Sequence, residues 1–481
     1  MFKSVAMKGL VATALYVSSA AASKMSSSVK VYLPKELSRP AGYDHREALF
    51  GIPPYGESIL ENVIYANHDM CYPIEKSGWK APFILLVDRG GCTFVQKVRN
   101  AQHAGATAVI IADNRCQCKH EKICRHESNQ VCERQEPIMA DDESGYDITI
   151  PSVLMFKQDA DPIKAALEDY KSVRMELTWS LPNPDSHVEW YLWTSPTDYM
   201  SSEFNYEFGV AVEAFGGQAS FTPNMYIYDG ITEGKCRNAE GKSECYTLCT
   251  NEGRYCAADP DLDLDYGISG ADVVAESLRR LCIWELYGKD DGVGMKYWNY
   301  VKEFINICDT SELFMKEDCV KRVMAKDTVQ IDYDAVDQCA YNHGGLERPE
   351  ENDLLQKQLD EKEANEIAIM PAVYVNGVAI RGELQFATVF KAICAGYAPG
   401  TEPRICTKCS NCHEEKACVV HGGKCPGDGA TVGSSTFVAS MASLVLVFSG
   451  IGASYYIRRQ RIMKEQVSPK DSYYYELVDF S

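Results

Sequence analysis

Residues 81–114 read APFILLVDRGGCTFVQKVRNAQHAGATAVIIADN, and this stretch decides the fold of the first half of the chain. Phe83–Val87 is an unbroken apolar run that ends in the turn residues of Asp88–Gly91, which predicts a buried strand. Phe94–Gly105 then carries apolar residues at helical spacing and closes with a glycine cap. Thr107–Ala112 predicts a second buried strand. Strand, glycine-rich turn, helix and strand together predict a compact α/β unit.

The same unit continues through residues 147–154 (DITIPSVL), which predict another strand after the acidic loop Asp141–Gly145. A nucleotide-binding unit is the alternative, but residues 89–92 lack the Gly-x-Gly-x-x-Gly spacing that it needs. From the DRGGCTF turn to the IPS strand, the stretch closely resembles a protease-associated (PA) domain. PA domains are non-catalytic modules that bind peptides or proteins, so the resemblance implies a binding role.

Composition limits the class of protein. The 481 residues suffice for roughly two to four domains. The 48 Lys+Arg against 68 Asp+Glu give a net charge of −20, which argues against nucleic-acid binding because that requires a basic face. All twenty cysteines lie between Cys71 and Cys425. This number is typical of an oxidising compartment and predicts that most cysteines form disulfides.

Two apolar segments predict the topology. Residues 1–22 have lysines, a short apolar run and an A-x-A pattern, which predict a cleaved signal peptide. Residues 436–457 carry no charge and are long enough to cross roughly 30 Å of hydrocarbon. The basic residues after this segment place the C-terminus in the cytoplasm and argue against a GPI signal. We therefore predict a single-pass type I membrane protein.

The tail, residues 458–481, is too short to fold alone. Tyr474-Tyr-Glu-Leu477 fits the Y-x-x-Φ pattern, in which the tyrosine and an apolar residue fill separate adaptor pockets. We predict a sorting signal at Tyr474 and Leu477 that binds a clathrin-adaptor subunit. A chance match in a short tail is the alternative.

A longer series of motifs resembles the vacuolar sorting receptors. The series comprises FGIPPYG at 50–56, VEWYLWT at 188–194, GRYCAADP at 253–260, IMPAVYVNG at 369–377 and RGEL at 381–384. The resemblance implies a receptor of Golgi, trans-Golgi and prevacuolar or endosomal membranes that sorts soluble vacuolar cargo such as hydrolase precursors. The alternatives are a membrane chaperone of the secretory pathway, or a relative of PA-containing proteases and ubiquitin ligases. The chain lacks the His-Glu-x-x-His and Gly-x-Ser-x-Gly motifs of hydrolases, so no enzyme activity is predicted.

The middle of the chain resembles a thioredoxin fold that lacks the redox-active cysteines. Residues 188–194 predict an aromatic strand, and Met370–Val375 predicts a strand entered through a proline, which in such folds is typically cis and faces the active-site loop. Redox work requires Cys-x-x-Cys just after the first strand, but residues 195–202 read SPTDYMSS. An insertion over residues 236–356 is expected to be helical and held by disulfides. Residues 350–367 predict a charged helix with a solvated face.

The predicted fold class is therefore α/β and multi-domain. The expected parts are a signal peptide (1–22), a PA domain with an N-terminal extension (23–178), a thioredoxin-like domain with a helical, disulfide-rich insertion (179–404), a cysteine-rich stalk (405–435), a transmembrane helix (436–457) and a tail (458–481).

No cofactor is predicted. The cysteines from Cys406 to Cys425 could be read as a metal site, and so could Cys116–Cys132 with its interleaved histidines, but disulfides are favoured in an oxidising lumen. Members of the resembled family carry calcium-binding EGF-like repeats after the thioredoxin-like domain. This chain has too few cysteine-bearing residues there for such repeats, which leaves calcium dependence open.

The PA resemblance places cargo binding on the glycine-rich turn and the acidic loop. The residues carried over are Arg89, Gly90, Cys92, Phe94, Asp141, Asp142, Glu143, Ser144 and Gly145. Glycines let a peptide approach closely, and Arg89 could hold a carboxylate. An ion pair of Arg89 with Asp88 or the acidic loop is an equal alternative. Cys71 is expected to pair with Cys92, and the family commonly has an acidic residue where Gly91 stands.

Histidines offer a means of releasing cargo. Five of the nine precede residue 151, namely His45, His68, His103, His120 and His126. Histidine titrates between pH 5 and 8, so protonation in an acidic organelle could destabilise the bound state. Surface histidines without such coupling are the alternative.

Overall fold

The computed structural model describes residues 26–74, 78–120, 132–232, 245, 247–347, 349–367 and 369–426. The chain divides into a unit that ends at Pro426 and a second that begins at Gly427, and all described residues lie in the first. The predicted signal peptide, membrane segment and tail lie outside the described residues. Within these residues, no helix has the length and apolar character needed to span a membrane.

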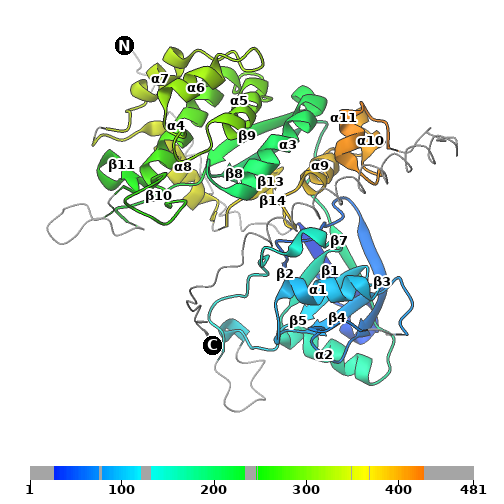
Figure 1. The fold of residues 1–481 in the computed structure, drawn as a ribbon. Helices are drawn as coiled ribbons and strands as arrows, with labels where there is room; N and C mark the ends of the chain where they lie inside the picture. Colours follow the sequence, from blue (N-terminus) through cyan, green and yellow to red (C-terminus); the bar gives the residue numbers. More distant parts are fainter. Residues whose placement is uncertain are drawn as a thin grey trace, which may run out of the picture. The chain divides into compact units, whose positions relative to one another are not determined.

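The first domain is built on a seven-stranded sheet (Figure 1). Its strands are β1 (Ser27–Leu33), β2 (His45–Glu47), β3 (Ser58–Tyr65), β4 (Ile84–Asp88), β5 (Ala108–Ala112), β6 (Ser152–Met155) and β7 (Arg174–Trp179), and its α-helices are α1 (Phe94–His103) and α2 (Lys157–Glu168). In space the order is β1-β7-β3-β4-β5-β6-β2, with β3 to β6 parallel to one another. The strands and the helix predicted for residues 83–112 are confirmed within one or two residues. The strand predicted for 147–154 is shorter, because residues 145–147 form a 3₁₀ turn.

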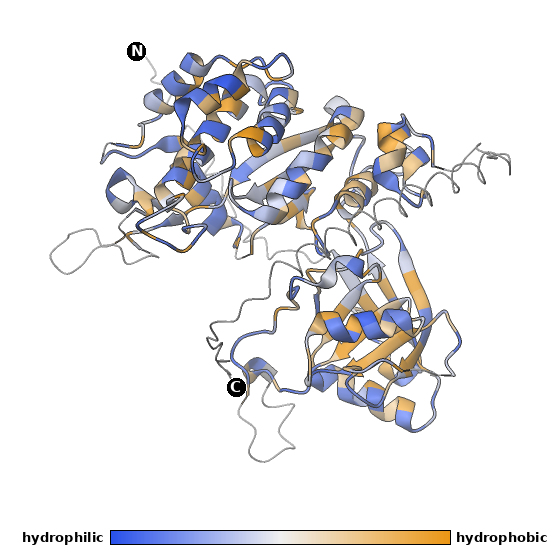
Figure 2. Cartoon of the chain, viewed as in Figure 1, coloured by the Kyte–Doolittle hydropathy of each residue, from blue (hydrophilic) through white to orange (hydrophobic). Residues whose placement is uncertain are grey.

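The two faces of this sheet bury different side chains, as the unbroken apolar sequence of β4 predicts. Leu85 and Val87 pack in one cluster with apolar side chains of α1, whereas Ile84 and Leu86 pack in another with those of α2. Figure 2 shows the same division, with apolar strands between helices that are hydrophilic on one side. Because β4 and β5 are parallel and α1 follows β4 in the chain, α1 begins near the carboxyl ends of both strands. Binding sites of α/β folds usually lie at this edge of the sheet.

The second domain has the sheet order β14-β13-β8-β9. Its elements are β8 (Val188–Thr194), α3 (Tyr199–Phe215), β9 (Ala219–Met225), β13 (Ala372–Val375), β14 (Val378–Ala379) and α9 (Phe386–Ala395). Trp190 of β8 lies in the core, with ring centroids of Phe208 and Phe221 at 5.4 and 4.5 Å. The Met370–Pro371 bond is cis, as predicted, and Met370 lines the same cavity as Ser195.

A helical insertion separates β9 from β13. It contains β10 (Tyr228–Asp229), β11 (Cys249–Thr250), β12 (Tyr255–Cys256), α4 (Gly270–Tyr287), α5 (Met295–Ile307), α6 (Glu317–Met324), α7 (Tyr333–Asn342) and α8 (Asp353–Ala364). The disulfides Cys249–Cys256, Cys282–Cys339 and Cys308–Cys319 hold it together, as expected. The sequence predicts a charged helix with a solvated face at α8. Lys357, Asp360 and Glu363 are exposed on that face, whereas Leu355 and Leu359 on the other face are buried.

The described part of the predicted stalk is packed rather than extended. It forms α10 (Arg404–Cys409) and α11 (Glu415–Val420), and α11 contacts α3 and α9. The disulfides Cys394–Cys406, Cys409–Cys418 and Cys412–Cys425 connect these elements. The sulfur atoms of Cys409, Cys412 and Cys418 lie close together, but all three are oxidised, so none is a thiolate ligand for a metal.

Two motifs far apart in sequence meet through hydrogen bonds. The hydroxyl of Tyr55 donates to the carbonyl of Arg381 at 3.0 Å and accepts from its N–H at 2.7 Å. The next residue, Gly382, has φ +92° and donates to the carbonyl of Ala48 at 3.0 Å. A Cβ at Gly382 would lie 2.4 Å from Pro53, so this close approach requires glycine.

Candidate functional site

The turn after β4 is fixed by a disulfide and two glycines. Cys71 and Cys92 are bonded, as expected. Gly90 and Gly91 have φ of +114° and +80°, a region that favours glycine. A Cβ at Gly91 would lie 2.4 Å from Asp69 Oδ2 and 2.9 Å from the Cys71 sulfur. The turn therefore has no room for a side chain at this position.

A buried lysine holds this turn from the side of α1. Lys97 is fully buried, and its ammonium donates to the carbonyl oxygens of Asp69, at 2.6 Å, and of Gly90. Burial lowers the pKa of Lys97 from its ordinary value, against the opposing effect of the Asp69 and Asp88 charges. The Gly90 carbonyl is thereby directed into the domain.

Arg89 is bound to acidic groups of the fold. Its Nη1 lies 2.9 Å from a carboxylate oxygen of Asp113 and 2.9 Å from one of Glu133. The Asp113 side chain is fully buried, so Arg89 neutralises a carboxylate that would be costly to bury alone. The partners differ from those suggested by the sequence, since Asp88 instead pairs with a lysine of α2. These contacts favour the ion-pair interpretation of Arg89 over direct peptide binding.

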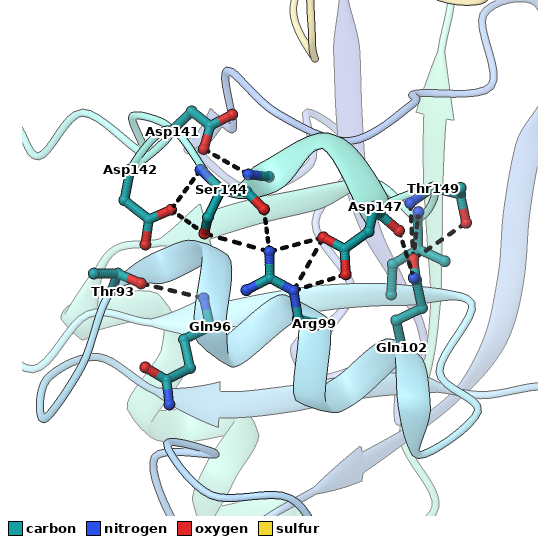
Figure 3. Close-up of polar contacts among 11 residues, drawn as sticks. Thr93, Gln96, Arg99, Gln102, Asp141, Asp142, Ser144, Asp147 and Thr149 are labelled. Carbon is teal, nitrogen blue, oxygen red and sulfur yellow. Dashed lines mark hydrogen bonds and ion pairs between the residues drawn. The ribbon is translucent and has the colours of Figure 1, made fainter. Parts of the chain in front are cut away.

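The acidic loop lies against the start of α1 (Figure 3). Thr93 caps the helix by accepting from the Gln96 N–H at 3.2 Å, and its hydroxyl also bonds to Asp142. Asp142 accepts from the hydroxyl and N–H of Ser144 at 2.6 and 3.2 Å. Burial acts to raise the pKa of Asp142, but hydrogen bonds from Ser144 and Thr93 outweigh it and hold the pKa below its usual value. The two predicted segments thus meet at a helix N-terminus, where negative charge is stabilised.

A second connection runs from the middle of α1 to the end of the loop. Arg99 Nε lies 2.8 Å from Asp147 Oδ2, and Nη2 lies 2.7 Å from Oδ1. The Nη2 group also donates to the Ser144 carbonyl (Figure 3). Hydrogen bonding from Arg99 holds the pKa of Asp147 below its ordinary value. Gln102, three residues further along, donates to the Asp147 carbonyl at 2.9 Å and accepts from the Thr149 N–H at 2.8 Å.

The exposed part of this site is acidic and polar. Its exposed residues are Gly91, Thr93, Gln96, Asp142, Glu143, Tyr146 and Thr149. The predicted residues Cys92 and Phe94 are partly buried, and Phe94 packs against the core between α1 and the sheet. The Gly145 N–H bonds to Asp141 at 3.0 Å, which closes the loop on itself. Such a surface can accept hydrogen bonds from peptide N–H groups and attract cationic side chains.

Four residues of α1 and its N-cap were absent from the prediction: Thr93, Gln96, Arg99 and Gln102. They recur at every third position, so they form one inclined ridge on the helix, beside the ridge of the buried Val95, Val98 and Ala101. This spacing of polar residues could have identified them, because a ridge of polar side chains on one helix indicates a neighbouring polar segment that it contacts.

Other predicted clusters resolve into disulfides and single histidines. Cys118 and Cys132 are bonded, and Cys116 is also in a disulfide, whereas Cys124, His126 and the His120 side chain lie outside the described residues. His45 is buried, with its ring bonded to the Tyr43 carbonyl and the Ser27 hydroxyl at 2.8 and 2.7 Å. His68 and His103 are exposed.

Family models match both domains: "PA domain" over residues 60–163 and "Vacuolar sorting receptor thioredoxin-like domain" over 188–394. Vacuolar-sorting receptor 1 of Pisum sativum is 33% identical over 407 residues, which are 78% of this chain and 60% of that protein. Vacuolar-sorting receptor 4 of Arabidopsis thaliana is 32% identical over 397 residues, with the same coverage. This chain is a homologue of the vacuolar sorting receptors.

The resemblance read from the motifs is therefore confirmed, as are the two domain types. The chain spans about 60% of the length of these relatives. A rice protein, "Receptor homology region, transmembrane domain- and RING domain-containing protein 1", is 43% identical over 77 residues, only 15% of this chain. This similarity is therefore limited to a small part of the chain.

The solved structures that match this chain are only distantly similar to it. An aminopeptidase from Aneurinibacillus matches 32% of this chain and 30% of its own at 18% identity and a TM-score of 0.22. An oxidised DsbA1 mutant matches 45% of this chain and 85% of its own at 11% identity and a TM-score of 0.25. At these scores neither match bears on function.

Proposed function

We propose that this protein is a single-pass type I cargo receptor that carries soluble proteins, such as hydrolase precursors, from the Golgi to the vacuole or lytic compartment. The supporting observation is the succession of a PA domain and a vacuolar sorting receptor thioredoxin-like domain, shared with named vacuolar-sorting receptors. The role is binding rather than catalysis, since the redox position of the second domain reads SPTDYMSS.

In this proposal the cargo peptide binds where the 89–94 turn meets the 141–145 loop. Asp142 and Glu143 offer carboxylates to peptide N–H groups or a cationic side chain, and Gln96 offers an amide. Gly91 is exposed, so a peptide can reach the backbone of this turn. Arg89, Cys92 and Phe94 support this surface from within the domain and do not touch the peptide.

The membrane segment and the tail complete the proposed receptor. Residues 436–457 would cross the membrane, and Tyr474–Leu477 would bind a clathrin-adaptor subunit at Golgi, trans-Golgi and prevacuolar or endosomal membranes. Replacing Tyr474 and Tyr475 with alanine is expected to move the protein to the cell surface. An unchanged distribution in cells would contradict the sorting signal.

A pull-down tests the cargo assignment. Residues 23–430 are immobilised at pH 7, exposed to secretory-pathway proteins and eluted at pH 5, with identification by mass. We expect soluble hydrolases, and we expect an Asp142→Asn/Glu143→Gln variant to recover far less of them. Recovery of diverse unfolded proteins by both forms would instead indicate a membrane chaperone.

A further inference from the structure

One disulfide of the first domain has a lysine ammonium beside it. Lys97 Nζ lies 3.5 Å from the sulfur of Cys71, which is bonded to Cys92. An ammonium has three N–H groups, and the carbonyl oxygens of Asp69 and Gly90 accept from two of them. The third N–H is directed at the sulfur. The Gly90 oxygen also lies 3.6 Å from this sulfur, but it accepts from Lys97, which offsets its partial negative charge.

The two bonded cysteines differ in their access to solvent. Cys71 is only 5% exposed, whereas Cys92 is only partly buried and lies between the exposed Gly91 and Thr93. A thiolate that opens a disulfide attacks one sulfur atom and expels the other as a thiolate. Attack at the accessible Cys92 sulfur therefore expels the Cys71 sulfur, which is the one beside the lysine.

The position of Lys97 favours this step. A cation beside a cysteine lowers the pKa of its thiol, and a leaving thiol of lower pKa is expelled faster. Burial lowers the pKa of Lys97 itself, but the charges of Asp69 and Asp88 oppose this and favour the ammonium form. The Cys71 thiolate would form next to this ammonium at a buried position, where opposite charges attract more strongly than in water.

A second disulfide of the chain provides a contrast. Cys412 is buried and Cys425 is only partly buried, which repeats the difference in access seen in the first pair. Their sulfur atoms lie 3.4 and 3.8 Å from the carbonyl oxygen of Lys408. A carbonyl oxygen carries partial negative charge and disfavours a thiolate. The two disulfides therefore differ mainly in the group beside the buried sulfur.

We propose that the Cys71–Cys92 disulfide is a thiol-exchange site, at which a low-molecular-weight thiol forms a mixed disulfide with Cys92. The thiolate of the added compound attacks the Cys92 sulfur, the bond between the two cysteines breaks, and Cys71 leaves as a thiolate held by Lys97. A second molecule of the compound then attacks the mixed disulfide and expels the Cys92 thiolate. Two thiol molecules are thereby oxidised to one disulfide, the protein disulfide is reduced, and both cysteines take protons from solvent.

Opening this disulfide would loosen the surface proposed for cargo. Thr93 directly follows Cys92, caps α1 and bonds to Asp142 of the acidic loop. Gln96, one turn further along α1, donates to the Cys71 carbonyl at 2.8 Å. The disulfide thus fixes the segment on which the turn and the loop meet. This consequence rests on the proposed function, whereas the exchange chemistry does not.

Mass spectrometry of the full chain in detergent tests the exchange. The protein is incubated with 2-mercaptoethanol at pH 7 and quenched at intervals with N-ethylmaleimide, which traps free thiols before digestion. We expect the mercaptoethanol adduct on Cys92, the maleimide label on Cys71, and opening about tenfold faster than that of Cys412–Cys425. An adduct on Cys71, or equal opening rates of the two disulfides, would overturn the proposal.

Replacing the lysine isolates its contribution. Lys97→Gln removes the cation and keeps a donor, so opening of the first disulfide is expected to slow about tenfold. Lys408→Gln is the matched control and should change neither rate, because the backbone carbonyl of Lys408 lies near the second disulfide. A Lys97→Gln protein that is folded by circular dichroism and opens as fast as the wild type would contradict the proposal. If this variant does not fold, the adduct position and the two wild-type rates decide the outcome.

The effect on cargo is measured separately. A recovered cargo peptide is expected to bind about fivefold more weakly or worse once the Cys71–Cys92 bond has been opened. Unchanged affinity would overturn the coupling between this bond and the cargo surface. The exchange rates are obtained without cargo, so failure of the proposed function leaves the test of the exchange site intact.

Discussion

Arg99 and Asp147 form a two-pronged ion pair between α1 and the loop that precedes β6, with Nε–Oδ2 and Nη2–Oδ1 distances of 2.8 and 2.7 Å. The two residues are 48 positions apart in sequence, so the contact connects two segments that are distant along the chain. A guanidinium can make two parallel hydrogen bonds to a carboxylate, and an ammonium cannot. The position of the acidic loop therefore depends on the shape of Arg99 as well as its charge.

Replacement of Arg99 should affect binding more than stability. Both Arg99→Ala and Arg99→Lys are expected to weaken binding of a recovered cargo peptide about tenfold, because the loop loses its two-pronged support. The pair is partly exposed, so each variant should lose only about 1 kcal/mol of unfolding free energy. Isothermal titration and urea unfolding measure the two effects. Arg115→Ala, at a more exposed arginine, is the control, and unchanged affinity in Arg99→Ala would contradict the assignment.

Arg89 should show the opposite pattern. Arg89→Ala leaves the buried Asp113 carboxylate without its cation and is expected to cost about 3–5 kcal/mol of unfolding free energy. The double variant Arg89→Ala/Asp113→Asn should recover part of this loss, because it removes the uncompensated charge. Denaturant unfolding of the single and double variants checks both values. A stable Arg89→Ala protein with weak cargo binding would restore the peptide-binding role of Arg89.

The two glycines of the turn should differ in their tolerance to substitution. Both have positive φ, so alanine strains either one. At Gly91 a Cβ would also collide with Asp69 and the Cys71 sulfur, whereas at Gly90 its nearest neighbour is Asn114 at 3.3 Å. We expect Gly91→Ala to cost about 1 kcal/mol or more beyond the cost of Gly90→Ala. Thermal unfolding of the two variants measures the difference, and equal melting temperatures would contradict it.

The sequence predicts the first domain well because its strands are buried on both faces and its helix has a clear apolar stripe. The motifs likewise identify both domain types, and an even cysteine count in an oxidising compartment predicts disulfides. The partners of individual charges are not predictable in this way. Arg89 pairs with Asp113 and Glu133 because three-dimensional packing brings the ends of separate segments together, and nothing in the local sequence of Arg89 indicates this choice.

The burial of α8 illustrates a second limit. Its sequence is dominated by charges, and yet Leu355 and Leu359 fall on one face and pack into the core. A hydrophobic stripe this narrow is easily masked by flanking glutamates and lysines. The packed form of the 404–426 segment has a similar cause, since its disulfides were expected but the surface that α11 covers on α3 and α9 is set by tertiary structure.

His45 makes stability depend on pH in a direction that can be worked out. Burial lowers the pKa of His45 below its ordinary value of about 6.5, although the hydrogen bond to the Tyr43 carbonyl opposes this. Below pH about 6.5 the unfolded chain therefore binds a proton at this position more readily than the folded chain does. The contribution of His45 to stability is complete above that pH and is lost as the pH falls toward the folded-state pKa, by at most about 1.4 kcal/mol per pH unit.

The neighbouring Glu47 acts in the opposite direction, since burial raises the pKa of its carboxyl. The two effects partly cancel in the wild-type protein, so the informative quantity is a difference between variants. The unfolding free energy of His45→Gln should fall less between pH 7 and pH 5 than that of the wild type, because glutamine keeps hydrogen-bonding groups and does not titrate. His103→Gln, at an exposed position, should follow the wild type. Parallel pH profiles for wild type and His45→Gln would show that His45 does not couple protonation to folding.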